Sequence, residues 1–260
     1  MSGAPVLLDV RGLVKSFGGV HAVSDLALSV CAGEIHALIG PNGSGKTTTL
    51  NVISGIYRAD AGSIRFDGRE LCGMPPHAIA AAGVARTFQN IRLFAGLSVR
   101  ENVMIGRHPR TSANVVTAVF SGRATAREER ETRERAEELL AFVGLPRAAG
   151  APARSLPYGD QRRVEIARAL ATEPRLLLLD EPAAGMNPAE TDDLIGLVGR
   201  IRERGITLLL IEHDMNVVMT VSDRITVLNF GTQIAAGAPS EIARDREVIA
   251  AYLGGSIDAA

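Results

Sequence analysis

Residues 40–47 read GPNGSGKT, which fits the spacing G-x-x-x-x-G-K-[ST]. An apolar strand pattern, IHALI at 35–39, precedes this stretch, and the helical run TTTLNVI overlaps its end. Gly40, Gly43 and Gly45 allow the backbone angles that turn successive N–H groups inward, and the start of the helix adds partial positive charge. The stretch therefore predicts a phosphate-binding loop between a strand and a helix.

Lys46 and Thr47 end this stretch, and each has a chemical role in a phosphate site. A lysine here reaches the β- and γ-phosphates of a nucleotide, and the hydroxyl of the next residue ligates Mg²⁺. Because Lys15 and Lys46 are the only lysines in the sequence, a chance match is on the order of one in a thousand. We expect further nucleotide contacts from the polar neighbours Asn42, Ser44 and Thr48.

A continuous aliphatic strand pattern ends in two carboxylates. Residues 176–181 read LLLLDE, and a strand without polar positions is typical of a parallel sheet that is buried on both faces. The carboxyl end of such a strand opens at the ligand crevice of an α/β fold. Asp180 fits a second ligand for Mg²⁺, and Glu181 fits a residue that orients or deprotonates an attacking water.

Two further side chains follow strand patterns. LLLIEH at 208–213 ends in His213, which we expect at the same edge of the sheet and in contact with the γ-phosphate. Gln89, in RTFQN, follows a short strand and can act as a sensor beside Mg²⁺ and water, although a glutamine in a loop is more often only solvated. The remaining histidines are interpreted as structural: His21, His36, His77 and His108.

The order of the elements predicts one large α/β domain. Residues 6–39 alternate strand patterns with glycine turns. From about 95 to 145 the pattern becomes helical and includes a capping box of Ser98 and Glu101. After the Pro/Ala/Gly-rich stretch 146–155, helices and apolar strands alternate, which is typical of a parallel sheet covered on both faces.

Composition limits the classes of function. The chain has 260 residues and a net charge of −1, which gives no argument for bulk nucleic-acid binding. Cys31 and Cys72 are too few for a disulfide framework, which favours a reducing compartment. The N-terminus has no signal-sequence pattern, and no stretch approaches the roughly 20 apolar residues that span a bilayer. We expect a soluble, cytoplasmic protein whose membrane contact is peripheral.

Together these motifs resemble those of the ATP-binding subunit of ABC transporters, and the resemblance extends over nearly the full chain. The motifs are GPNGSGKT, LLLLDE, RTFQN and LLLIEH. The resemblance implies an α/β P-loop NTPase of the ABC ATPase type, with a RecA-like core, an N-terminal antiparallel β subdomain and an inserted α-helical subdomain. Within a single domain, 1–260, it implies a β subdomain with the phosphate-loop part of the core (1–94), a helical subdomain (95–155), and the rest of the core with a C-terminal helix (156–260).

The resemblance also implies ATP and Mg²⁺ as cofactors and assigns residues to them. Gln89 joins Thr47 and Asp180 as a metal ligand, and Phe17 of KSFGG matches the aromatic residue that stacks on adenine in the family. His213 matches the switch histidine. The residues implied to act in hydrolysis are Glu181, His213 and Gln89.

Residues 156–160, LPYGD, match the loop that usually reads LSGGQ in this family. In ABC dimers this loop and the helix after it face the γ-phosphate held by the other subunit, so Tyr158 and Gly159 are implied nucleotide contacts. Tyr158 supplies either a phenolic hydrogen bond or packing. Pro157 replaces the family's serine and has neither a hydroxyl nor a backbone N–H. The D-loop, AGMN, carries Asn187 where an aspartate is usual.

Five stretches look like one ATPase subunit of branched-chain amino acid importers. They are the YG-type loop, QRRVEIARALAT, LDEPAAGMNP, IEHDM and the terminal VIAAYLG. This implies integral membrane permease subunits and a second ATPase subunit, identical or related, as partners. A periplasmic or surface substrate-binding protein is an indirect partner, and the chain lies at the cytoplasmic face of the inner or plasma membrane. Ile91, Leu93 and Phe94 are expected apolar anchors for a membrane partner's helix, or else local core. The apolar run within 107–126 is a surface helix or loop, a further membrane-subunit contact, or a segment near lipid headgroups.

Other classes of function stay open on the sequence alone. ATPases of urea import or lipopolysaccharide export use similar catalytic loops, as do soluble ABC ATPases that act on nucleic acid or ribosomes. The single cassette and the lack of a basic patch or tail disfavour the soluble class. A nucleotide-binding module without turnover is disfavoured because Glu181 is present.

Overall fold

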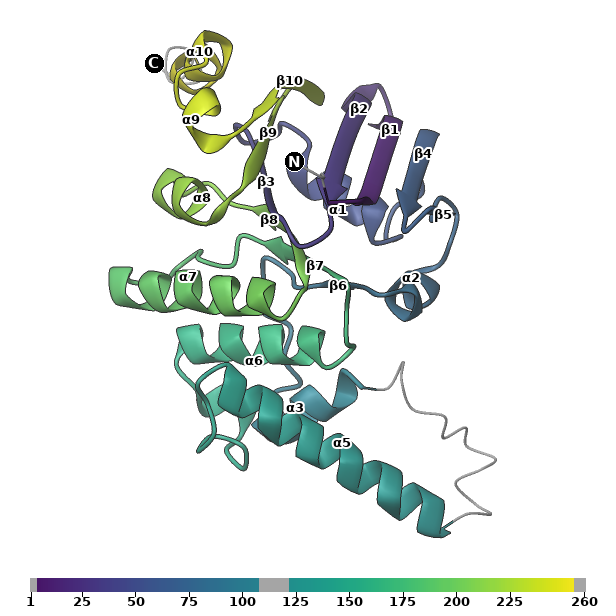
Figure 1. The fold of residues 1–260 in the computed structure, drawn as a ribbon, viewed down its shortest axis with the longest axis vertical. Helices are drawn as coiled ribbons and strands as arrows, with labels where there is room; N and C mark the ends of the chain where they lie inside the picture. Colours follow the sequence, from purple (N-terminus) through teal and green to yellow (C-terminus); the bar gives the residue numbers. More distant parts are fainter. Residues whose placement is uncertain (1–3, 108–121, 255–260) are drawn as a thin grey trace.

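The computed structural model describes residues 4–107 and 122–254, in which two sheets lie beside a layered set of helices (Figure 1). The N-terminal sheet is antiparallel, with the strand order β2-β1-β4-β5. Its strands are β1 (Val6–Phe17), β2 (Val20–Cys31), β4 (Ala61–Phe66) and β5 (Arg69–Glu70). The predicted N-terminal antiparallel sheet is therefore confirmed.

The second sheet has six strands in the order β10-β9-β3-β8-β7-β6. All its pairs are parallel except that of β10 with β9, which is antiparallel. The strands are β3 (Ile35–Ile39), β6 (Val84–Arg86), β7 (Leu176–Asp180), β8 (Thr207–Ile211), β9 (Arg224–Asn229) and β10 (Thr232–Gly237). Because β3 and β7 flank β8 and run parallel to it, the loops after them open at the same edge of the sheet.

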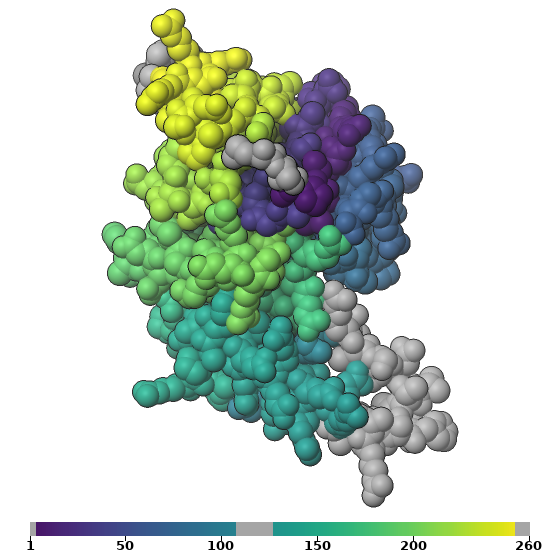
Figure 2. Space-filling model, in the orientation of Figure 1, coloured from purple at the N-terminus to yellow at the C-terminus, as the bar shows by residue number. Residues whose placement is uncertain are grey.

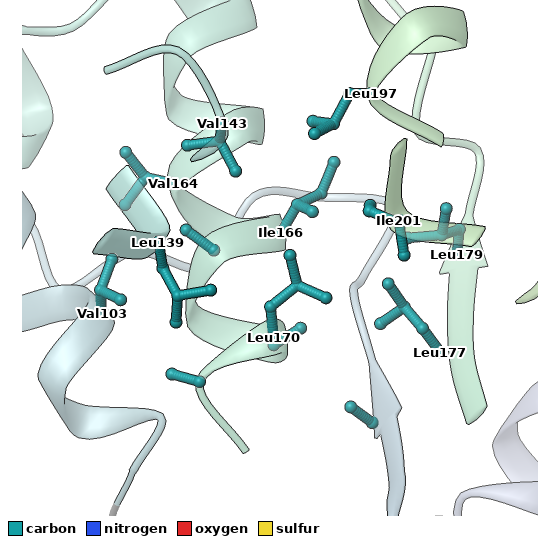
Figure 3. Close-up of a cluster of buried hydrophobic side chains, with 14 of the residues drawn as sticks. Val103, Leu139, Val143, Val164, Ile166, Leu170, Leu177, Leu179, Leu197 and Ile201 are labelled. Carbon is teal, nitrogen blue, oxygen red and sulfur yellow. The ribbon is translucent and has the colours of Figure 1, made fainter. Parts of the chain in front are cut away.

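Strand β7 contributes to two hydrophobic cores at once. Leu177 and Leu179 belong to the core on the helical side (Figure 3), whereas Leu176 and Leu178 belong to the core shared with the antiparallel sheet. This alternation follows from the period of two in a strand. All five residues of β7 are buried, so the predicted strand with two buried faces is confirmed. A buried leucine contributes roughly 1.5–3 kcal/mol.

Helix α6 lies at the centre of the helical side. In Figure 3, Val103 of α3 and Leu139 of α5 lie on one side of α6, and Leu197 and Ile201 of α7 lie on the other. The helices are α1 (Lys46–Ile53), α2 (Pro76–Ala82), α3 (Val99–Ile105), α5 (Gly122–Phe142), α6 (Tyr158–Leu170), α7 (Pro188–Glu203), α8 (Met215–Val221), α9 (Pro239–Ile242) and α10 (Arg246–Gly254). A single 3₁₀ turn, Ala153–Ser155, precedes α6 among the described residues.

Two helices begin with reciprocal capping boxes. The Ser98 hydroxyl accepts a hydrogen bond from the Glu101 N–H at 3.2 Å, while the Glu101 carboxylate accepts one from the Ser98 N–H at 2.7 Å. This confirms the predicted box at the start of α3. At α7, Asn187 and Glu190 form the same arrangement, with both distances 3.0 Å. The asparagine at this D-loop position is therefore a helix cap, a role in which asparagine and aspartate are equally favoured.

Figure 2 shows the antiparallel sheet, in purple and blue, and the α3–α5 region, in teal, at different ends of the molecule. Over the residues that the structure describes, no helix is both long and apolar enough to cross a membrane. The apolar run predicted as a surface element or membrane-subunit contact falls within 108–121, outside the described residues. The subdomain boundaries at 94 and 155 stay predictions.

Candidate functional site

The glycines of the 40–47 loop are required by the close packing around it. A Cβ atom on Gly40 would lie 2.1 Å from the carbonyl oxygen of Leu228, and one on Gly45 would lie 2.3 Å from that of Ala22. Gly45 also has a φ of 101°, in the region that favours glycine. Side chains at these two positions would push the loop away from the sheet, so the glycines fix where the loop lies.

Lys46 closes this loop from inside. Its Nζ donates hydrogen bonds to the carbonyl oxygens of Gly40 at 2.8 Å and Pro41 at 2.9 Å. Burial lowers the pKa of the Lys46 amine, while the negative charges of Glu181 and Asp180 act in the opposite direction. The amine therefore lies between the loop carbonyls and the carboxylates at the end of β7.

The loop, Gln89 and Glu181 share one cavity of about 300 Å³. Its lining residues are Ala22, Asn42, Gly43, Gly45, Lys46, Thr47, Thr48, Gln89 and Glu181. Gly40 and Ser44 are not in this lining, and Ser44 is buried in the loop. The first N–H groups of α1 have no intrahelical partners. The structure thus brings hydrogen-bond donors, a lysine and a carboxylate to one opening.

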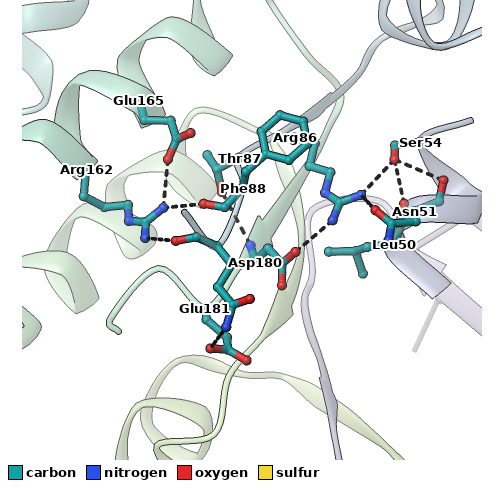
Figure 4. A network of polar contacts seen from close by, with 11 residues as sticks. Leu50, Asn51, Ser54, Arg86, Thr87, Phe88, Arg162, Glu165, Asp180 and Glu181 are labelled. Atoms are coloured by element: carbon teal, nitrogen blue, oxygen red, sulfur yellow. Dashed lines mark hydrogen bonds and ion pairs between the residues drawn. The ribbon is translucent and has the colours of Figure 1, made fainter. Parts of the chain in front are cut away.

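Asp180 lies buried at the end of β7, one residue before Glu181. Its Oδ2 accepts a hydrogen bond from Arg86 at 2.8 Å, whereas its buried Oδ1 has no hydrogen-bond partner among the described residues (Figure 4). Burial raises the pKa of Asp180, and the Arg86 guanidinium counteracts part of that effect. Asp180 itself is not in the lining of the cavity that Thr47 and Gln89 share. Its unpartnered carboxylate oxygen, the Thr47 hydroxyl and the Gln89 amide oxygen are nevertheless ligands of the kind that Mg²⁺ prefers.

Glu181 has an unusual backbone conformation and lies beside Gln89 and His213. Its φ of 46° is unusual for a residue with a side chain, and such strain is concentrated at functional sites. The Gln89 amide donates to Glu181 Oε2 at 2.8 Å. His213 Nδ1 lies 3.8 Å from the same oxygen, and the His213 side chain is 63% exposed. The three residues predicted to act in hydrolysis therefore lie together, and their catalytic roles stay predictions.

Phe17 lies at the end of β1 and is 45% exposed. It makes a T-shaped contact with Tyr57, with ring centroids 5.1 Å apart and an angle of 73° between the planes. The Lys15 ammonium lies 5.2 Å from the centroid of the Phe17 ring. These contacts hold an exposed aromatic ring in place, as stacking on a base requires.

The 156–160 loop leads into α6 without a side-chain cap. Pro157 is the N-cap residue and makes no side-chain hydrogen bond to the first turn. The Tyr158 hydroxyl accepts a hydrogen bond from Arg162 at 3.2 Å, and its ring would be 3.4 Å from a Cβ atom on Gly185. Within the chain, Tyr158 therefore accepts a hydrogen bond from α6 and packs against the D-loop. Its predicted contact with the nucleotide of another subunit stays a prediction.

Gly159 is needed for packing within the chain. It is buried, and a Cβ atom there would lie 2.8 Å from Oε1 of Glu190, at the start of α7. The close approach seen at this residue is therefore between α6 and α7. Its predicted contact with the nucleotide of another subunit stays a prediction.

The predicted membrane-facing anchors are unequally exposed. Phe94 is 52% exposed, and its N–H donates to Oδ1 of the buried Asn102 at 2.8 Å. Leu93 packs against the helical-side core, and Ile91 is partly buried. The anchor interpretation therefore fits Phe94 best, while Leu93 fits the alternative of local core.

Sequence reasoning missed several buried charged residues around the site. Arg86 holds Asp180, and Arg162 pairs with Glu165 at 2.8 Å, with both side chains fully or almost fully buried. Glu212 is 1% exposed and accepts a hydrogen bond from Ala183 N at 2.7 Å, and burial raises the pKa of Glu212. The available signals were an acidic residue directly before His213 and an i,i+3 Arg–Glu spacing in an otherwise apolar helix face.

Comparisons with known proteins agree with this geometry. Residues 23–184 match the family model described as ABC transporter, and residues 232–258 match that of the branched-chain amino acid ATP-binding cassette transporter. A crystal structure of a nucleotide-free ATP-binding cassette from an ABC transporter has a TM-score of 0.84 at 32% identity, covering 95% of this chain and 99% of that one. The ADP conformation of another such cassette has a TM-score of 0.85 at 32% identity, with 96% and 100% covered.

Curated relatives extend the likeness along the chain. BraF of Pseudomonas aeruginosa, a high-affinity branched-chain amino acid transport ATP-binding protein, is 47% identical over 95% of this chain and 98% of its own length. LivG of Escherichia coli, with the same description, is 45% identical over the same shares. The probable LivG of Archaeoglobus fulgidus is 35% identical over 95% of each chain. The chain therefore belongs to the ATP-binding, ATP-hydrolysing subunits of ABC transporters, in the group whose members are named for branched-chain amino acid transport.

Proposed function

We propose that this chain hydrolyses ATP to power an importer of branched-chain amino acids, and that the residues at the shared cavity carry out the hydrolysis. The observation that carries the proposal is the convergence of the Lys46 loop, Gln89 and Glu181 on one cavity. The substrate class follows from the names of relatives that match 95% of the chain, because an ATPase subunit does not touch the transported molecule.

In this mechanism Lys46 and the N–H groups at the start of α1 bind the β- and γ-phosphates. Thr47, Asp180 and Gln89 would hold Mg²⁺, which neutralises phosphate charge when bound. Glu181 orients the water and accepts its proton, because it is a carboxylate at the edge of the cavity. Gln89 fixes the Glu181 side chain through the 2.8 Å hydrogen bond, and His213 contacts the γ-phosphate.

The second half of each nucleotide site comes from another ATPase subunit. The 156–160 loop would contact the γ-phosphate held by the partner, through Tyr158, Gly159 and the uncapped first turn of α6. One structural relative, described as a dimeric post-hydrolysis state of an ATP-binding cassette bound to ADP and Pi, supports a dimer, with a TM-score of 0.76 at 26% identity. Pairing with a related subunit is our preferred form of the dimer.

In this proposal the chain contacts integral membrane permease subunits at the cytoplasmic face of the membrane. A substrate-binding protein on the opposite side of the membrane acts on the chain only indirectly, through the permease subunits. Phe94 is the exposed apolar anchor for this contact. A second cavity, of about 310 Å³, lies nearby and includes Phe88, Ile79 and Ile105 in its lining. An apolar hollow next to the segment that carries Gln89 would let a permease helix influence the site.

The importer assignment is tested by isolating the tagged chain from native membranes and identifying the proteins bound to it. We expect permease subunits and a second ATPase subunit, and the reconstituted assembly should show leucine-stimulated ATP hydrolysis when the substrate-binding protein is present. Permeases of urea uptake or lipopolysaccharide export in their place would refute the substrate class. Stimulation of hydrolysis by nucleic acid or ribosomes would refute the transporter role.

Replacing Phe17 by alanine should weaken ATP binding by about tenfold, since base–aromatic stacking contributes roughly 1–3 kcal/mol. Affinity is measured by titration calorimetry with ATP and, separately, with inorganic triphosphate. Only ATP binding should weaken, because triphosphate has no base. Phe17→Tyr serves as the matched control and should bind ATP normally. Equal losses for both ligands would mean that Phe17 supports the loop and not the adenine.

A further inference from the structure

Arg162, on the second turn of α6, is a fully buried arginine with four polar contacts. Its Nη1 donates to the carbonyl oxygen of Phe88 at 2.6 Å, and its Nη2 donates to that of Gln89 at 2.7 Å. Figure 4 shows these bonds between the helix and the segment after β6. The Tyr158 hydroxyl, at the start of the same helix, accepts a second hydrogen bond from Nη2 at 3.2 Å. Arg162 thus joins the 156–160 loop to the backbone of Gln89.

The charge of Arg162 is balanced by a neighbour on the same helix. Glu165, 1% exposed, accepts from Arg162 Nη1 at 2.8 Å. Its other oxygen accepts from the Arg92 N–H at 3.4 Å, and Arg168 donates to the Arg92 carbonyl oxygen. Side chains of α6 therefore bind the segment at both ends, at residues 88–89 and at residue 92.

The segment after β6 changes its hydrogen-bond partners within two residues. β6 ends at Arg86, and the Thr87 N–H still donates to the Leu178 carbonyl oxygen of β7 at 2.9 Å. The carbonyl groups of Phe88 and Gln89 are bound by a side chain of α6. A buried backbone carbonyl group needs a hydrogen-bond donor, and the guanidinium supplies one to each of these two residues. It can therefore hold them in a conformation outside the sheet. The position of Gln89 thereby depends on the position of α6.

A buried ion pair is a costly way to gain stability, because desolvation of the two charges offsets most of their attraction. Apolar residues of similar volume often stabilise as well or better. What Arg162 supplies and an apolar side chain does not is two directed bonds to fixed carbonyl groups. The pair is therefore better explained by where it holds Gln89 than by the stability it adds.

We propose that Arg162, balanced by Glu165, is a positioning residue that sets the Gln89–Glu181 contact according to the position of the 156–160 loop. The path runs from Tyr158 through Arg162 to the Gln89 backbone, and through the Gln89 amide to Glu181 at 2.8 Å. A nucleotide of the second subunit that moves the start of α6 would then alter how the catalytic carboxylate is held. The inference rests on the proposed roles of Gln89 and Glu181.

A double-mutant cycle tests this path. The Arg162–Glu165 pair, here called the clamp, is removed in the variant R162M/E165M, which takes away both of its charges at once. Arg168, whose guanidinium lies 3.5 Å from Glu165, keeps its hydrogen bond to the Arg92 carbonyl oxygen. It is combined with Gln89→Ala in the full chain, within the assembly that co-purifies with it. We expect the clamp variant and Gln89→Ala each to lower kcat by about tenfold, and their combination to lower it no further, because both changes break one path. In the clamp variant the Kd for ATP should stay within about twofold, since neither Arg162 nor Glu165 lines the cavity of the Lys46 loop.

Arg163→Met is the matched control, because Arg163 lies beside Arg162 on α6 but pairs with Asp193 at the surface. It should leave kcat and its response to Gln89→Ala unchanged. Multiplied losses in the combined variant would overturn the proposal while leaving the role of Gln89 intact. An unchanged kcat in Gln89→Ala alone would overturn the assigned role of Gln89 and the inference with it. If the clamp variant does not fold, Arg162→Lys repeats the cycle, because a single ammonium cannot reproduce the fork that holds both carbonyl groups.

Discussion

Replacing Glu181 by glutamine is expected to slow ATP hydrolysis by about 10²–10⁴-fold, the range that a positioned general base contributes. The amide has nearly the same shape, and its oxygen can still accept the 2.8 Å hydrogen bond from Gln89. It cannot accept the proton of the attacking water. The phosphate loop is untouched, so ATP should stay bound, and the dimer that encloses it should accumulate.

The measurement combines phosphate release in a single turnover with size-exclusion chromatography in the presence of ATP and Mg²⁺. Glu203→Gln is the matched control, because Glu203 ends α7 as an exposed carboxylate outside the cavity. It should hydrolyse ATP at the normal rate and show no ATP-dependent accumulation of dimer. Unchanged hydrolysis in Glu181→Gln would exclude Glu181 as the base. Loss of ATP binding in that variant would mean that the carboxylate holds the site together.

Replacing Lys46 by alanine is expected to weaken ATP binding by about 100-fold or more, since hydrogen bonds between charged groups contribute about 1.5–3 kcal/mol each. The amine is buried between the loop carbonyls and the end of β7, so no neighbouring cation can take its place in the lining of the cavity. Calorimetric titration with ATP measures the loss, and thermal unfolding without nucleotide reports on the fold.

Lys46→Met separates the charge from the packing of the side chain, because it keeps most of the aliphatic stem. Both variants should lose ATP binding to a similar degree if the ammonium group binds phosphate. Near-native affinity in either one would show that the phosphate site lies elsewhere. Recovered binding in the methionine variant alone would assign Lys46 a packing role in the loop.

The parts of the fold that the sequence predicts well depend on local signals. The 40–47 loop, the Ser98–Glu101 box and the leucine strand β7 are each encoded by a few neighbouring residues. Spacing and periodicity specify these features wherever they stand in a chain. The edge at which they meet then follows from the parallel order of the strands.

The parts that escaped prediction depend on contacts between distant residues. Arg162 bonds residues 73 and 74 positions earlier, and Arg86 pairs with a carboxylate 94 positions later. Arginine is common in this sequence and is usually exposed, so the i,i+3 spacing of Arg162 and Glu165 is only a weak signal of a buried pair, and no local pattern marks Arg86. The roles predicted for Phe17, Tyr158 and Gly159 came from family resemblance. Their predicted partners are the adenine base and the nucleotide of a second subunit, and neither can be inferred from the residue pattern of a single chain.

The sharing of β7 between two cores has a consequence for the chain as a whole. Its leucines alternate between the helices and the antiparallel sheet, so each layer covers one side of the same strand. Helices α6 and α7 are therefore not a detachable addition to the sheet. A shortened chain without them would expose Leu177 and Leu179 to water and would be expected to aggregate instead of folding as a smaller nucleotide-binding unit.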